Sequence, residues 1–509
     1  MPERLPRRLI EVDLPIKRIS EQARREKSIR HGHISTLHIW WARRPLAACR
    51  AVILAGLLPD PADEACPQSF RNAAVGALAW RRTPADDREG LRQALLDFIA
   101  EFSNWDLAAH PDYLRTARAL VTAAYPEGPP TVLDPFAGGG AIPLEALRVG
   151  AEAWASDLNP VAVLLEKVVL EYVPRYGQRL AEGVRRWGEV IRERARSELG
   201  RFYPEDPDGS VPIAYLWART ARCEGPACGA RVPLLRGRWL SRRPDHQVAL
   251  ELLVHDGEVE FAIREGVRAL EVGPGTVRRG SLTCPICGHT TPVAAIRRQA
   301  QRQGLPERLV AVVTTRPGMQ GRRYRLPLEH DLRAAEEAEA ELERRAAAHR
   351  GPLSLVPDEP LPPKGTLGFR IQGYGLETWG DLFTPRQKLA LSTLAGLVRD
   401  TYPEIVEETG DEGLARAIGT CLGLSLDKTA DLGNSLTRWK PDADCPVNMY
   451  GRQAIPMVWD FAEAVPISSA SGSFESQYHR TVDSLIPLIP IDNVGIAMAG
   501  SATSLAAAD

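Results

Sequence analysis

Long apolar runs are absent from this sequence, and so is an apolar N-terminal leader. Residues 51–58 are among its longest apolar stretches, far short of the ~20 residues that a membrane-spanning helix needs. The N-terminus, MPERLPRRLIEVDLPIKRIS, carries charges where a signal peptide has its apolar core. These absences predict a cytoplasmic protein without a membrane span.

An excess of one charge sign and internal repeats are also lacking. The 509 residues include 63 Lys+Arg and 65 Asp+Glu, a net charge of -2. Any contact with a polyanion would therefore have to come from local patches. The length allows about two to four domains.

A glycine-rich stretch has the pattern of a nucleotide-type cofactor site. A short buried strand is predicted over Thr131–Leu133, a tight turn over Gly138–Gly140 and a helix over Ile142–Arg148. A second predicted strand, Ala153–Ser156, ends in Asp157, about 20 residues past the turn, where a doubly wound fold hydrogen-bonds a ribose. A lone glycine turn is a weak motif, but this order of elements favours a cofactor site over an ordinary loop.

Several phrases resemble one family of DNA methyltransferases. DPFAGGG and SDLNP resemble the S-adenosylmethionine site of amino-methylating DNA methyltransferases. With HIWWARRPLAACRA, YGLETWGDLFTPRQKLAL, DKTADLGNSLTRW and GRQAIPMVWDFAEA, they make nearly the whole chain similar to bacterial and archaeal adenine-specific DNA methylases. Those methylases carry a zinc-ribbon insert and an N-terminal domain of unknown function, numbered 1156.

The resemblance implies how the cofactor would be held. Asp134 and the glycines would face the methionine part of S-adenosylmethionine, Asp157 would face the ribose hydroxyls, and the N-terminal HIWWARRP segment would help to hold the methionine end. The predicted cofactor-binding residues are Asp134, Pro135, Phe136, Ala137, Gly138, Gly139, Gly140, Asp157, Leu158 and Asn159.

Two close cysteine pairs predict a structural zinc site. Cys223 with Cys228 and Cys284 with Cys287 lie on tight turns with Gly or Pro, and four thiolates can converge on tetrahedral zinc at ~2.3 Å. The long gap between the pairs, which the strand-like residues 248–267 would fill, leaves two reduced turns without metal as the alternative. The other thiols are interpreted as buried or free: Cys49, Cys66, Cys421 and Cys445.

Cations interleaved with indoles suggest local contacts with nucleic acid. Packing in a core with arginines on the rim explains the same residues as well. The candidates are Trp40, Trp41, Arg43, Arg44, Arg438 and Arg452. Arginines also concentrate around the cysteine pairs, from Arg236 to Arg325, which suggests either a phosphate-facing surface or a solubilising rim.

The catalytic quartet of the family is missing. In the family, a returning strand, here Val494–Gly500, precedes a fourth strand that ends in Asp or Asn, Pro-Pro and an aromatic residue. Those groups accept the N–H bonds of the adenine amine and stack on a flipped base. Neither Pro-Pro pair of this sequence has the required neighbours, so no catalytic residue is assigned. We expect one half of a methyltransferase, completed by a second polypeptide, or a truncated gene.

The fold prediction follows from these elements. We expect an α/β protein with a doubly wound, Rossmann-like class I methyltransferase sheet that is incomplete and carries a large zinc-ribbon and helical insertion. The expected parts are an N-terminal basic and aromatic segment (1–60), a helical connector (61–130), the first half of an S-adenosylmethionine-binding domain (131–175), a zinc-ribbon insert with flanking helices (176–350), a linker and helical block (351–490) and the returning strand (491–509).

The resemblance implies an S-adenosylmethionine-dependent DNA adenine-N6 methyltransferase, or its cofactor-binding half, in restriction-modification or phage defence. Its partner would be DNA. Two alternatives stay open: a catalytically inactive DNA-binding or regulatory subunit on the same scaffold, and an RNA base methyltransferase.

Overall fold

The molecule is a mixed α/β protein with several separate sheets. The computed structural model describes residues 4–29, 31–81, 87–451 and 454–502. They form two compact units: unit 1 comprises Met1–Arg185, Ile405–Cys421 and Arg480–Asp509, and unit 2 comprises Arg186–Glu404 and Leu422–His479. Among the described residues, no helix is both long enough and apolar enough to cross a membrane.

The N-terminal part of unit 1 is a group of helices that share one apolar core. These helices are α1 (Ile16–Glu26), α2 (Leu46–Leu57), α3 (Gln68–Leu78), α4 (Arg88–Phe102) and α5 (Pro111–Ala124). Leu54, Phe70 and Phe98 are fully or almost fully buried in that core. Val149, which follows the later helix α6 (Ala141–Arg148), belongs to the same core, so the helices and the glycine-rich stretch fold as one body.

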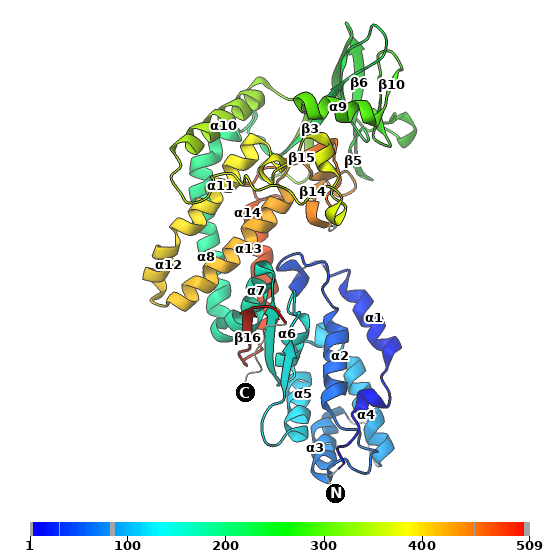
Figure 1. Cartoon of the computed structure of the whole chain (residues 1–509), viewed down its shortest axis with the longest axis vertical. Helices are drawn as coiled ribbons and strands as arrows, with labels where there is room; N and C mark the ends of the chain where they lie inside the picture. The colour runs from blue at the N-terminus through cyan, green and yellow to red at the C-terminus, as the bar shows by residue number, and fades with distance from the viewer. Residues whose placement is uncertain (1–3, 30, 82–86, 452–453, 503–509) are drawn as a thin grey trace. The chain divides into compact units, whose positions relative to one another are not determined.

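A three-stranded parallel sheet follows in unit 1. Its strands are β1 (Thr131–Asp134), β2 (Glu152–Asp157) and β16 (Ile496–Ala499), in the order β1-β2-β16. In Figure 1 the dark-red β16 lies beside the cyan segment around α6, although the two are far apart in the sequence. The predicted strands and the returning strand are therefore confirmed as secondary structure.

The helices around this sheet begin where local chemistry predicts. Gly140 adopts φ 72° directly before α6. Asn159 caps α7 (Pro160–Glu166) by accepting a hydrogen bond from Val161 N, and Pro160 occupies the first helical position. A π-helical turn, η5 (Lys167–Tyr172), continues α7 and leads into α8 (Val173–Leu199).

The outer edge of β1 is open in the part of the chain that the structure describes. There, β1 pairs with β2 alone. Leu133 is 55% exposed, and Phe136 just beyond the strand is 78% exposed. An apolar strand edge of this kind offers unpaired backbone groups to which a further strand can pair.

Unit 2 is built on antiparallel sheets. The central one runs β12 (Arg323–Arg325), β11 (Glu307–Thr315), β3 (Val211–Arg222) and β15 (Asp460–Ala464), with β4 (Arg231–Pro233) also paired to β3. The smaller sheets are β5 (Trp239–Arg243) with β6 (His246–His255) and β7 (Glu258–Glu265); β8 (Val277–Arg278) with β9 (Ser281–Thr283) and β10 (Thr290–Thr291); and β13 (Arg438–Lys440) with β14 (Cys445–Val447). Strands β6 and β7 fill the gap between the cysteine pairs, as predicted.

The predicted helical block after the linker is only partly helical. The remaining helices of the chain are α9 (Val293–Gln303), α10 (Glu329–Ala348), α11 (Pro385–Asp400), α12 (Tyr402–Thr409), α13 (Glu412–Leu432) and α14 (Phe474–Leu485). Between α13 and α14 the chain forms β13, β14 and β15. Residues 460–464 pair with the distant β3, and this tertiary pairing outweighs their local helical pattern.

Candidate functional site at the glycine loop

The glycine loop joins β1 to α6 and is tied to the end of β2. Gly138 and Gly140 have φ of 53° and 72°, a conformation that side chains with a Cβ rarely adopt. Gly138 N donates to Asp157 Oδ2 at 2.9 Å, and Asn159 N donates to Asp157 Oδ1 at 2.9 Å. Asp157 thus lies at the loop as predicted, and it holds the loop in place.

The N-terminal segment covers this loop. A Cβ atom on Gly138 would lie 2.5 Å from Nε1 of Trp40, and one on Gly139 would lie 3.1 Å from Nε of Arg43. Only glycine allows so close an approach. Trp40 and Arg43, considered above as nucleic-acid contacts, therefore line the glycine loop, whereas Trp41 and Arg44 are exposed.

Three carboxylates gather around the loop. Asp134 ends β1 and accepts a hydrogen bond from Phe136 N at 3.1 Å. Burial, together with the nearby Asp157, raises the pKa of Asp134. The third is Glu166, the last residue of α7, whose Cγ lies 3.7 Å from the position of a Cβ on Gly140. The carboxyl ends of β1 and β2 thus present a concentration of acidic groups.

Glu166 is the most unusual of the three. Its side chain is fully buried, and neither carboxylate oxygen has a hydrogen-bond partner among the described residues. Burial, and then the charges of Asp157 and Asp134, raise the pKa of Glu166 to about 8, against a weaker opposing effect of Lys167. A buried carboxyl group without a partner is costly, so an unexplained one at a loop of this kind marks a candidate binding group.

Behind the loop, α6 carries a buried ion network in which one carboxylate is matched by two guanidinium groups. Glu145 Oε2 lies 2.6 Å from Arg50 Nε and 3.0 Å from Arg148 Nε. Arg50 and Arg148 also donate to the carbonyl oxygens of Phe102 and Ala108. Although burial opposes it, the two guanidinium groups hold the pKa of Glu145 below its usual range. The network fastens α2 of the N-terminal segment to α6.

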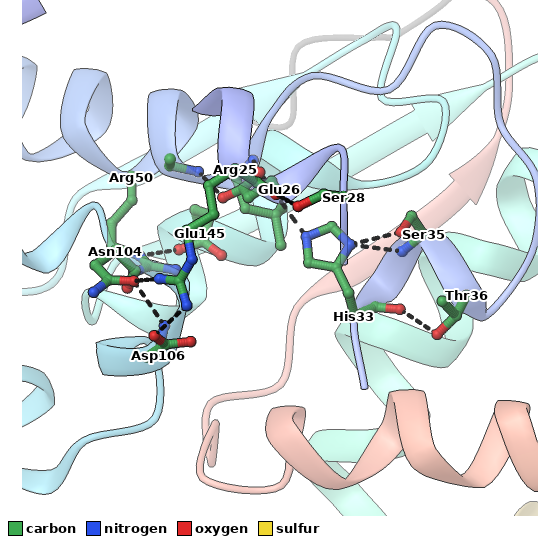
Figure 2. Close-up of polar contacts among 12 residues, drawn as sticks. Arg25, Glu26, Ser28, His33, Ser35, Thr36, Arg50, Asn104, Asp106 and Glu145 are labelled. Carbon is green, nitrogen blue, oxygen red and sulfur yellow. Dashed lines mark hydrogen bonds and ion pairs between the residues drawn. The ribbon is translucent and has the colours of Figure 1, made fainter. Parts of the chain in front are cut away.

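A second buried acid of the N-terminal segment caps α2 (Figure 2). Glu26 accepts hydrogen bonds from Leu46 N at 2.8 Å and Ala47 N at 2.7 Å, and burial raises its pKa to about 7. Figure 2 also shows His33 between Glu26 and Ser35: His33 Nε2 lies 3.9 Å from Glu26 Oε2, and Nδ1 accepts from Ser35 N. Burial, and then the charge of Arg43, lower the pKa of His33 to about 4, so His33 is a neutral structural histidine.

The other predicted cofactor residues lie along the same loop with different exposure. Phe136 is 78% and Leu158 75% exposed, at the rim, and Ala137 is buried. Pro135 is half-buried. Asn159 has a structural explanation as the cap of α7.

The four predicted zinc ligands converge in unit 2. Their sulfur atoms lie within 4.8 Å of one another, with Cys223 Sγ 3.6 Å from Cys287 Sγ and Cys228 Sγ 3.9 Å from Cys284 Sγ. Tetrahedral zinc with Zn–S bonds of ~2.3 Å requires sulfur atoms about 3.8 Å apart. The cluster could therefore hold a metal and is compatible with zinc. Cys49, Cys66 and Cys421 are buried elsewhere.

Arginine and tryptophan side chains line a cavity of about 270 Å³ in unit 2. Its lining includes Arg236, Arg238, Arg242, Arg438, Trp217, Trp239 and Trp439, and Asp460 is the acidic residue of the lining. Burial lowers the pKa of Arg238, whose Nε has no hydrogen bond within the described chain. Arg452, the remaining nucleic-acid candidate, lies outside the described residues. Arg325 is taken up by ion pairs with Asp206 and Asp331, so it does not extend this basic surface.

Comparison with known proteins identifies only the N-terminal segment. Residues 13–77 match a family model described as a protein of unknown function, DUF1156. No curated protein and no solved structure matches the chain. The matched segment contains Glu26, His33, Trp40, Arg43 and Arg50, so it supplies both the cover of the glycine loop and the network behind it.

Sequence reasoning missed Glu166, Glu145 and their surroundings. The available signal for Glu166 was a single acid inside the apolar run PVAVLLEKVVL, where an unpaired charge is unexpected. No local signal marks Glu145, because its partner Arg50 lies 95 residues away in the chain.

Proposed function

We propose that this chain binds S-adenosylmethionine at the glycine loop, as the cofactor-binding part of a DNA adenine-N6 methyltransferase with a Rossmann-like sheet. The observation that carries the proposal is the gathering of Asp134, Asp157 and Glu166 around the loop. In a dinucleotide site the pyrophosphate lies at such a loop. Ionised carboxylates at this loop would repel a phosphate, whereas a ligand with a positive charge would be attracted and would favour the charged forms of these acids.

S-adenosylmethionine matches this environment because its sulfonium and its α-ammonium group are positive. Asp157, at the tip of the second strand, is where a ribose would be hydrogen-bonded. The cofactor supplies the reactive methyl group. The residues of this chain bind and orient it, and Trp40 covers the loop. DPFAGGG and SDLNP add the resemblance to amino-methylating enzymes, from which the choice of adenine and the role in restriction-modification or phage defence follow.

The proposal assigns the activation of the adenine amine to a strand that is not among these residues and that a second polypeptide could supply. The Asp/Asn-Pro-Pro-aromatic quartet does not occur in this sequence. The open edge of β1, with Leu133 exposed, offers backbone groups to which a further parallel strand could pair. Catalysis would then need both chains, and this chain alone would bind the cofactor without transferring the methyl group.

Unit 2 would contact the DNA. The four-cysteine cluster, with all its ligand positions filled by thiolates, would be structural rather than catalytic. The arginine and tryptophan side chains around the cavity offer cations for phosphates and indoles on which a base can stack.

Calorimetric titration of the purified chain tests the proposal. We expect S-adenosylmethionine and S-adenosylhomocysteine to bind, while ATP and NAD do not. Asp157→Ala should abolish binding, and Asp112→Ala, which changes an acid of α5, should not. Binding of ATP or NAD in place of the adenosyl ligands would overturn the proposal.

Methyl transfer from labelled cofactor separates the alternatives once the second polypeptide is added. Transfer of the label to duplex DNA would support the adenine-N6 assignment. Transfer of the label to structured RNA and not to DNA would support the RNA enzyme. Cofactor-independent DNA binding without any transfer would identify a regulatory subunit.

A further inference from the structure

A buried acid and a buried guanidinium nitrogen lack hydrogen-bond partners at the glycine loop among the described residues. Glu166 is fully buried, and both of its carboxylate oxygens lack a hydrogen bond within the described residues. Arg43 Nε is also buried and likewise lacks an acceptor within them, although Arg43 Nη2 donates to His38 O at 3.2 Å. An unsatisfied buried polar group is destabilising, and here such groups occur twice around one loop.

The two groups flank consecutive residues of the loop. Arg43 Nε lies 3.1 Å from the position of a Cβ on Gly139, and Glu166 Cγ lies 3.7 Å from that on Gly140. Arg43 comes from the N-terminal segment and Glu166 from the end of α7, where the helix changes to the π-helical turn η5. Such π-helical insertions occur frequently at functional sites.

Glu166 is the exception among the buried carboxylates of the same unit. Glu145 accepts hydrogen bonds from two arginines, and Glu26 accepts two backbone N–H groups. The fold therefore supplies partners where buried charge is structural. An acid without a partner and a guanidinium with an unsatisfied Nε–H, on adjacent positions of a loop, match a ligand that carries both signs of charge close together.

We propose that Glu166 and Arg43 bind the amino-acid end of the adenosyl ligand, with Glu166 receiving the α-ammonium group and Arg43 the α-carboxylate. This inference rests on the proposed function and assigns residues to one end of the ligand. It gives the N-terminal segment a direct role in recognising a zwitterion. It also predicts that adenosyl compounds without an amino-acid end bind weakly.

A proton should leave the site when the ligand binds. Glu166 is protonated in the free protein at pH 7, because burial and the neighbouring Asp134 and Asp157 disfavour its charged form more than Lys167 favours it. An ammonium group placed against the carboxyl favours the charged form. Ligand binding at pH 7 should therefore release close to one proton, and Glu166→Gln should remove that release.

The test compares S-adenosylhomocysteine with 5′-methylthioadenosine, two neutral thioethers that differ by the amino-acid end. Calorimetry on the wild-type chain should show S-adenosylhomocysteine binding about 100-fold more tightly, since each charge-assisted hydrogen bond contributes about 10-fold or more. In Glu166→Gln and in Arg43→Gln this ratio should fall to about 10-fold or less. Glu182→Gln and Arg115→Gln, at exposed positions of unit 1, should keep the wild-type ratio.

Titration in two buffers of different ionisation enthalpy gives the second readout, proton release. The affinity for 5′-methylthioadenosine reports that the adenosine part of each variant is folded. An unchanged ratio and unchanged proton release in Glu166→Gln would overturn the inference while leaving the proposed function intact. Absence of binding of every adenosyl compound to the wild-type chain would overturn both.

Discussion

The buried acids near the two ends of helix α6 differ in their hydrogen-bond partners. Toward its C-terminal end, Glu145 and Arg148 form a network with Arg50 in which the carboxylate accepts from both guanidinium groups. At its N-terminal end, Glu166 and Arg43 approach the glycine loop with atoms that have no partner among the described residues. The carboxylate of the first arrangement has partners in the folded chain, whereas that of the second has none among the described residues and, by the inference above, would receive one from a ligand.

The same N-terminal segment contributes to both ends. Arg50 belongs to the matched network, Arg43 and Trp40 face the loop, and all three lie within the residues 13–77 that match the family of unknown function. The segment is therefore part of the glycine-loop site rather than a separate appendage. Its buried network fixes the wall from which Trp40 and Arg43 approach the loop.

Metal removal should have the largest effect, because the four-cysteine cluster of unit 2 could hold a metal and is compatible with zinc. Structural zinc sites contribute apparent binding free energies on the order of 10 kcal/mol. Cys284→Ser should lose the metal, measured by elemental analysis, and expose residues 223–291 to proteolysis. Cys66→Ser, in the core of unit 1, is the control and should keep the metal. Wild-type protein that contains no metal would contradict this prediction.

Glu145→Gln should be the next most damaging change. It removes the only carboxylate of the matched network and leaves Arg50 and Arg148 buried without a counter-charge. Breaking a buried pair in this way costs about 3–5 kcal/mol. Urea denaturation followed by circular dichroism measures the loss. Glu89→Gln, which breaks an exposed pair with Arg92, is the control and should cost under ~1 kcal/mol. Equal losses of stability in the two variants would show that the Glu145 network does not stabilise the fold as a buried ion network should.

Glu166→Gln should stabilise the folded chain at alkaline pH, which is opposite in sign to the effect of Glu145→Gln. The pKa of Glu166 is about 8 in the folded chain against 4.5 for the ordinary group, so the folded state binds the proton more tightly. Its contribution to stability is present below pH 4.5 and is lost as pH rises through 8. The Gln variant cannot ionise, so near pH 9 it should be more stable than the wild type by about 2–4 kcal/mol, with little difference at pH 5. Urea denaturation at both pH values measures this, and a variant equally destabilised at both would show that Glu166 has a partner.

Local patterns in the sequence predicted the parts of the fold that local chemistry determines. Strands β1, β2 and β16, the glycine loop and the convergence of four cysteines were all predicted and are confirmed. Each depends on residue type and short spacing. The pairing of β15 with β3 was missed, because its partner strand lies more than 200 residues earlier in the chain.

The candidate site was predicted only in part for the same reason. The loop and Asp157 follow from the order strand, turn, helix, strand and acid. The resemblance implied that the segment with Trp40 and Arg43 lies near the methionine end of the cofactor, but its residue pattern alone does not specify which distant surface it covers. Glu166 was overlooked because its importance comes from the lack of a hydrogen-bond partner among the described residues. That lack can be recognised only from the three-dimensional positions of the surrounding residues.

The smallest effect on stability is expected for Gly139→Ala, which tests whether the approach of Arg43 to the loop matters for binding. Gly139 lacks a positive φ, so alanine fits its backbone, but the new Cβ would lie 3.1 Å from Arg43 Nε and 3.3 Å from Arg43 Nη2. The long side chain can move aside, and the cost in stability should be under ~1 kcal/mol. Moving Arg43 from the loop should nevertheless weaken S-adenosylhomocysteine about 10-fold. Gly76→Ala is the matched control: it lies in α3 with no atom within 4 Å of the added Cβ, so it should leave affinity unchanged and raise stability slightly. Equal affinities in the two alanine variants would show that Arg43 does not contact the ligand.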